Sequence, residues 1–173
     1  MKRPKQVDLN DAVQHPGRVV EFDVETSLEE EEDVDLLKPI VGKLEAVSTG
    51  NLLFIDGNLR AELMLECSRC LKPVEMKMDL QVHEEFPVDG VPAGFGNREY
   101  AEVKEEGEAY PLFDGNSLRW EDLVRQCLWL SMPTRTVCSE ECPGIGDFEP
   151  HDGDGRPELA ALSQLLEDEE DSS

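Results

Sequence analysis

The chain has 173 residues, of which 40 are acidic and 16 are basic, so its formal net charge is −24. Its longest apolar run, CLWL at 127–130, is too short to cross a bilayer, which takes about 20 residues, and the N-terminus has no apolar signal segment. We therefore expect a cytoplasmic protein with no membrane partner, whose cysteines are ligands or free thiols rather than disulfides.

Most of the negative charge lies in two segments. Residues 21–35 hold nine acidic and no basic residues, and residues 140–171 hold twelve acidic residues and one arginine. The rest of the chain is nearly balanced, so the overall charge does not decide which partners it binds. Acidic segments of this kind are either simply solvated, or they repel phosphate and attract a basic protein.

The first part of the chain is expected to contain one short helical turn and one strand. Residues 1–17 form an N-terminal segment whose helical turn ends at Pro16 and Gly17. Residues 18–25 alternate apolar and polar side chains, which is typical of a half-buried strand. The charge run that follows predicts an acidic loop over residues 26–37.

From residue 39 to residue 86 the alternation is sustained. It predicts antiparallel strands with one buried face, separated by a turn at 49–51 and by a hairpin tip at 67–70. Asp56, Gly57 and Asn58 fit either a second turn or a bulge within one long strand. Beyond the tip, apolar residues alternate with a polar set that ends at His83.

A second acidic loop is expected over residues 87–110, and residues 111–115 fit a short edge strand. Residues 117–131 are the clearest helix, capped by Asn116 or Ser117. Its predicted buried stripe is Trp120, Leu123, Val124, Cys127 and Leu128.

These elements predict an α+β fold: an antiparallel, twisted sheet or partial barrel, a packed helix, a loop that carries a cysteine pair, and acidic tails. Residues 18–150 are expected to form one domain, and residues 151–173 a C-terminal helix that runs into an acidic tail.

Two cysteine pairs carry the only recognisable chemistry. Cys67 and Cys70 flank two residues at the hairpin tip, and Cys138 and Cys142 flank three residues after the helix. Four thiolates in two close pairs are the ligand set of a tetrahedral structural zinc site. Arg69, Lys72 and Arg135 lie beside the pairs and have the right charge to support such an anionic centre.

The pairs also fit two other interpretations. The thiols could be reduced and unliganded, or they could form a thiol/disulfide redox site. A redox motif usually has its CxxC at a helix N-terminus, whereas Cys67 and Cys70 lie between two alternating runs. No catalytic motif, small-molecule site or phosphate-binding loop is apparent, so we expect a protein that is not an enzyme.

The segment LECSRCLKPVEMKMDLQVHEEF and the later segment DGNSLRWEDLVRQCLWLSMPTRTVCSEECPG together resemble the YceD family. This family comprises proteins tied to accumulation of large-subunit ribosomal RNA. Many members continue with a further cysteine pair, where this chain has GIGDF, so its four candidate ligands limit it to one metal.

The resemblance implies a non-enzymatic ribosome-biogenesis factor that supports accumulation or processing of large-subunit ribosomal RNA. Two modes of action remain open. Arg69, Lys72 and Arg135 could contact RNA phosphates directly, or the acidic segments could hold a basic ribosomal or processing protein. The charge distribution favours the second mode.

Overall fold

In the computed structural model, residues 5–28, 34–93, 100–105 and 110–145 are described. The elements run in the order β1 (Val7–Asp8), α1 (Asn10–Gln14), β2 (Val19–Thr26), β3 (Asp35–Ser48), β4 (Leu52–Glu66), β5 (Pro73–Asp89), β6 (Glu102–Val103), β7 (Phe113–Asp114), β8 (Ser117–Leu118) and α2 (Trp120–Ser131). The expected C-terminal helix of residues 151–173 lies outside the described residues.

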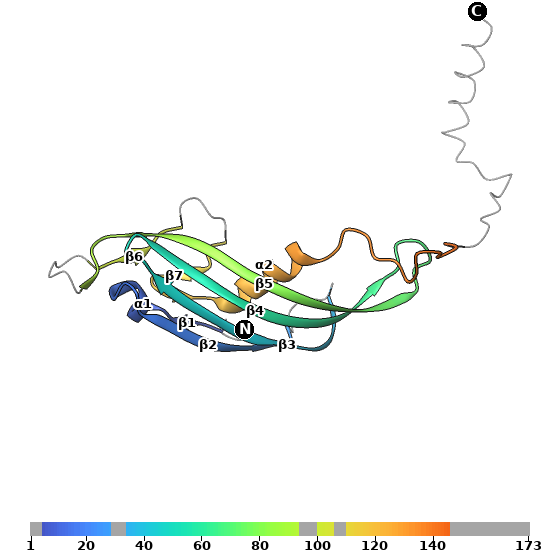
Figure 1. Cartoon of the computed structure of the whole chain (residues 1–173), viewed down its shortest axis with the longest axis horizontal. Coiled ribbons are helices and arrows are strands. Elements are labelled where there is room, and N and C mark those ends of the chain that lie inside the picture. Colours follow the sequence, from blue (N-terminus) through green and yellow to red (C-terminus); the bar gives the residue numbers. More distant parts are fainter. Residues whose placement is uncertain (1–4, 29–33, 94–99, 106–109, 146–173) are drawn as a thin grey trace, which may run out of the picture.

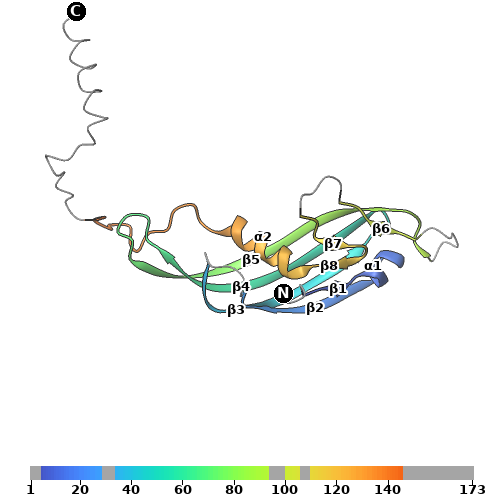
Figure 2. The same ribbon diagram turned by 180° about the vertical axis from the view of Figure 1, so that it is seen from behind.

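Within the described ranges, two antiparallel sheets form. The larger has the strand order β2-β3-β4-β5-β6 and curls into a partial barrel, and the smaller has the order β1-β8-β7. Figure 2 shows α2 and the small sheet lying along one face of the large sheet. The predicted α+β class, with a twisted antiparallel sheet and a packed helix, is confirmed.

The strands follow from the alternation in the sequence. Along β4, the apolar side chains that face the core are fully buried (Leu53, Ile55, Leu59, Ala61 and Leu63), while Arg60 between them is exposed. Every second side chain of a strand points to the same face, so this pattern buries one face of the sheet and leaves the other to solvent.

The turn expected at residues 49–51 does connect β3 to β4. The second candidate turn is instead part of one continuous strand, in which Gly57 lies opposite Leu44 of β3 and Val82 of β5. β3 begins at Asp35, so the acidic loop between β2 and β3 is shorter than residues 26–37. On the C-terminal side, β5 extends to Asp89, three residues into the expected loop 87–110.

The helix begins later than the sequence suggests, and the predicted caps are wrong. α2 starts at Trp120, and Arg119 is the N-cap residue, with no side-chain capping bond. Ser117 instead pairs in β8. The side-chain Nδ2 of Asn116 donates to the Asn10 Oδ1 and to the Ala101 carbonyl, both at 3.0 Å. The predicted buried stripe of the helix is confirmed in all five positions.

The N-terminal segment contributes to the same core. β1 pairs with β8, and Ala12 and Val13 of α1 are fully buried in the hydrophobic cluster that also contains the α2 stripe. The core therefore lies between the curled sheet and a cover made of α1, α2 and the small sheet.

The β4–β5 hairpin is longer than the rest of the sheet. Figure 1 shows its far end projecting beyond the body as an arm, and the segment after α2 runs out to the same end. This arrangement carries both cysteine pairs away from the core.

Candidate metal centre

The hairpin tip is a tight turn between the end of β4 and the start of β5. The Cys67 amide donates to the Lys72 carbonyl at 2.8 Å, and the Leu71 amide donates back to the Cys67 carbonyl at 2.9 Å. Leu71 has a φ of +60°, a left-handed conformation that turns the chain tightly. The turn thereby brings the Cys67 and Cys70 side chains close together.

The segment that follows α2 is held against this tip by backbone hydrogen bonds. The Ser68 amide donates to the Thr136 carbonyl at 2.8 Å, and the Thr136 amide donates to the Ser68 hydroxyl at 3.2 Å. Further on, the Ile145 amide donates to the Arg69 carbonyl at 3.0 Å. These contacts bracket Cys138 and Cys142, so the second pair is positioned over the first.

The four sulfur atoms form one compact cluster. The Sγ atoms of Cys67 and Cys142 are 3.8 Å apart, and those of Cys70 and Cys138 are 3.7 Å apart. All four lie within 4.8 Å of one another, and no other group of three or more potential ligands occurs in the part of the chain that the structure describes. The predicted meeting of the two pairs is confirmed.

These distances fit a zinc ion. Sulfur atoms placed tetrahedrally at about 2.3 Å from zinc are separated by edges of about 3.8 Å. The cluster is closed on one side, because Cys67 and Cys142 are buried, and open on the other, where Cys138 is exposed. The described cysteines are all free thiols.

Backbone amides stabilise negative charge on Cys67. Amides of Arg69, Cys70 and Cys138 donate to its sulfur and lower its pKa to about 6; the Cys138 amide lies 3.4 Å away. At Cys70, the Lys72 amide lowers the pKa, but desolvation and the Cys142 and Cys67 thiols outweigh it and raise the pKa overall. Amide-to-sulfur hydrogen bonds favour the thiolates that a metal requires.

The three predicted contact cations occupy different surroundings. The Arg69 guanidinium donates from Nη1 to the carbonyl oxygens of Glu140 at 3.1 Å and Cys142 at 3.2 Å, so it joins the tip to the second pair. Lys72 and Arg135 are exposed and make no ion pair with another described residue. Their proposed contact with RNA or a partner stays a prediction.

Sequence patterns did not predict the Ser68–Thr136 pairing, because it joins two loops with no periodic signal. They also did not identify Glu84, an acidic residue at an inward position of β5, opposite the buried Ile55. The alternation through Leu80 and Val82 would have identified it if it had been extended by one step.

In the described part of the chain, no helix is both long enough and apolar enough to cross a membrane. Among curated proteins, the chain is similar to uncharacterized proteins of Mycobacterium bovis and Mycobacterium tuberculosis, with 28% identity over 142 residues. The match covers 80% of this chain and 59% of each relative, so the chain is considerably shorter than they are. No solved structure matches it.

The family model described as "Large ribosomal RNA subunit accumulation protein YceD" matches residues 55–169. This span begins in β4 and contains both cysteine pairs, β5 and α2. Because the match covers well over half of the sequence, and because the matched part contains the arm, the helix and the sulfur cluster, the chain belongs to the YceD family.

Proposed function

We propose that this chain is a non-enzymatic factor that supports accumulation of large-subunit ribosomal RNA, and that a structural zinc ion locks the tip of its arm. The family match supports the ribosomal part of the proposal. The single observation that supports the zinc ion is the cluster of four sulfur atoms with separations of 3.7 and 3.8 Å across its two segments.

The metal would act as a clamp. Cys67 and Cys70 would hold it from the hairpin, and Cys138 and Cys142 from the segment after α2. A bound zinc ion stabilises the folded state because the unfolded chain has no preformed site. Four thiolates leave no ligand position open for water, and catalytic zinc sites keep such a position. This donor set therefore favours a structural rather than a catalytic role.

Metal analysis of the purified protein tests the clamp. We expect one zinc ion per chain, and loss of that ion in Cys138→Ser. Cys127→Ser is the matched control, because Cys127 lies in the buried stripe of α2 and outside the cluster. Zinc retained in Cys138→Ser, or absent from the unaltered protein purified without chelators, would contradict the proposed site.

The biological part is tested in cells depleted of the protein. We expect large-subunit ribosomal RNA to fall relative to small-subunit RNA, with recovery when the unaltered chain is supplied. Cys138→Ser should restore it less well, because the tip and the loop would no longer be joined. Equal levels of both RNAs after depletion would contradict the proposed role.

The factor would act by binding a basic protein rather than by binding RNA directly. The acidic segments 21–35 and 140–171 repel phosphates, and they attract basic ribosomal or processing proteins. Binding of a large-subunit RNA fragment at low salt tests the direct alternative. Direct contact would weaken steeply with salt, and again in Lys72→Glu, because each phosphate contact releases counterions.

A thiol/disulfide redox protein is the second candidate. The observation that favours it is the pKa of Cys67, which is lowered to about 6, since a thiolate is the reactive form of cysteine. In this function Cys67 would attack a disulfide of a partner. Its burial argues against such access, because it is fully buried beneath the second pair.

A further inference from the structure

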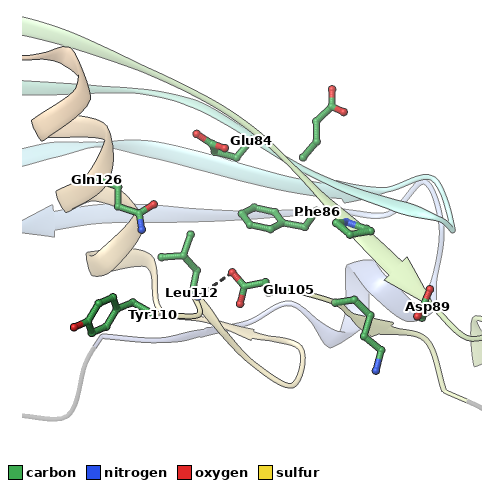
Figure 3. Close-up of a pocket in the computed structure, with 10 residues that line it drawn as sticks. Glu84, Phe86, Asp89, Glu105, Tyr110, Leu112 and Gln126 are labelled. Atoms are coloured by element: carbon green, nitrogen blue, oxygen red, sulfur yellow. Dashed lines mark hydrogen bonds between the residues drawn. The ribbon is translucent and has the colours of Figure 1, made fainter. Parts of the chain in front are cut away.

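A cavity of about 650 Å³ opens on the body of the protein, away from the arm. It lies between the last third of β5, residues 104–105 and 110–112, and α2 (Figure 3). Phe86 and Leu112 are nearly buried and provide its apolar walls, while Gln126 lies at the helix side. Tyr110, which is 85% exposed, stands at its edge. Such a site can take a side chain with an apolar stem.

One charged group in this cavity is unusual. Glu84 belongs to a row that faces the core: Ile55 lies opposite it on β4, and Ala46 lies opposite Ile55 on β3, and both are fully buried. Its carboxylate is half-buried and makes no hydrogen bond or ion pair with another described residue. A carboxylate directed inward without a partner is costly unless a cation or water meets it.

The charge of Glu84 acts on the interior. After burial, the largest cause, it is the second reason why the pKa of Cys127 on α2 rises to about 11. The carboxylate therefore lies close enough to α2 for its charge to act on a side chain of the helix. A cation bound in the cavity would relieve this unpaired charge.

The other charges of the cavity are also mostly negative. Asp89 adds an exposed carboxylate from β5, whereas the Glu85 carboxylate turns to the solvent face of the sheet, 3.7 Å from His83 Nε2. Glu105 is already engaged, since its two oxygens accept the amides of Leu112 and Phe113 at 2.9 Å each. Among the described residues that line the cavity, Lys104 is the one basic residue. Phosphate groups would be repelled here, whereas a cationic side chain would be attracted.

We propose that this cavity binds an arginine or lysine side chain of a basic protein segment, with its aliphatic stem against Phe86 and Leu112 and its charge on Glu84. Tyr110 would add a contact between its ring and the cation. The inference rests on the proposed function, in which a basic protein is the partner, and assigns that partner a docking site. The cavity would thus bind a basic segment of the partner, and the arm would make no contact with that segment.

A peptide titration of the full ¹⁵N-labelled chain tests the site. The probe is a peptide of alternating arginine and glycine, and its control carries citrulline in place of arginine. We expect amide shifts at Glu84, Phe86 and Leu112 with the arginine peptide and none with citrulline. Glu84→Gln should weaken binding about tenfold, because it removes the charge while keeping the shape.

Glu45→Gln is the matched control. Glu45 is an exposed carboxylate on the opposite face of the sheet, so this variant changes the net charge equally and should weaken binding by about twofold or less. Tyr110→Ala, at an exposed position, gives a second variant that leaves the core intact and should weaken binding about threefold.

Equal weakening by Glu84→Gln and Glu45→Gln, shifts that map elsewhere, or a large-subunit RNA fragment that shifts the same amides would each overturn the docking site. Failure of the proposed function would show separately, as unchanged ribosomal RNA in depleted cells, whatever the titration gives. Unchanged zinc content and an unchanged or raised melting temperature in Glu84→Gln establish that its effect on binding is local.

Discussion

The Arg69 guanidinium reaches from the hairpin tip to the carbonyl oxygen of Cys142, 3.2 Å away. The same nitrogen donates to Glu140, and the Arg69 carbonyl accepts the Ile145 amide. Arg69 is thus hydrogen-bonded through its guanidinium and through its backbone carbonyl to the segment that carries the second cysteine pair. A residue that the sequence marks as a candidate RNA contact serves here to hold the two halves of the cluster together.

We therefore expect Arg69→Ala to weaken zinc binding about tenfold, because groups that orient metal ligands typically contribute that much to affinity. Competition with a coloured chelator measures the change. Lys72→Ala is the control, since this neighbouring cation is exposed and makes no ion pair with another described residue. Equal zinc affinities in the two variants would show that Arg69 does not support the site.

The packing of α2 gives the second prediction. Leu123 is 1% exposed, and Leu130 on the same helix is 84% exposed. Leu123→Ala should lower the free energy of unfolding by about 2–5 kcal/mol, and Leu123→Asp should prevent folding, because it would bury an unpaired charge. Leu130→Ala should change it by about 0.5 kcal/mol or less. Thermal and urea unfolding of the three variants measures these changes. If Leu130→Ala lowered the free energy of unfolding more than Leu123→Ala does, the assigned buried face of the helix would be wrong.

Much of the fold could be predicted because alternation reports directly on burial. The spacing of apolar residues in the sequence was enough to predict strand β4 and the five buried positions of α2. The start of α2 could not be predicted in this way. Asn116 and Ser117 are good helix caps in isolation, but Asn116 instead contacts Asn10 and Ser117 pairs with β7. Tertiary contacts of this kind leave no local pattern.

Gly57 illustrates the same limit and gives the third prediction. The sequence could not distinguish a turn from a strand at this glycine, whereas in the structure a Cβ at Gly57 would lie 2.2 Å from the Lys43 carbonyl oxygen. Gly57→Ala should destabilise the protein by about 3 kcal/mol, since the strands would have to separate. At Gly17 a Cβ meets nothing within 4 Å, so Gly17→Ala should cost about 1 kcal/mol from its positive φ alone. Similar melting temperatures for both variants would contradict the close approach.

In the candidate site, the ligands could be predicted from the sequence, but the contacts that hold them together could not. Cysteine spacing identifies pairs that can share one ion, and the distances confirm that the pairs meet. Spacing cannot say what holds them, and the Ser68–Thr136 pairing and the Arg69 contacts exist only once the segment after α2 reaches the arm. Glu84 was overlooked among many acidic residues, although the alternation through Leu80 and Val82, extended by one step, gives its inward direction.

The pH dependence of the exposed sheet face gives the fourth prediction. His83 Nδ1 lies 2.5 Å from Asp56 Oδ1, directly across the β4–β5 ladder, and this hydrogen bond, together with the charge of Asp56, raises the pKa of His83. The stabilisation is fully present below the ordinary histidine pKa of about 6.5 and is lost as the pH rises through the higher value of the folded protein. NMR titration of the His83 ring should show the raised pKa and its decrease in Asp56→Asn; an unchanged midpoint would contradict the pairing.

Counting reactive thiols gives the fifth prediction, and it separates the zinc clamp from the redox protein. With zinc bound, iodoacetamide at neutral pH should modify none of the five cysteines, because four would be ligands and burial raises the pKa of Cys127 to about 11. A chelator should expose four thiols without any reductant, and a denaturant should expose the fifth. Mass spectrometry counts the added groups. If only two thiols reacted after chelation until a reductant was added, a disulfide would be present in the resting protein, and the redox function would replace the clamp.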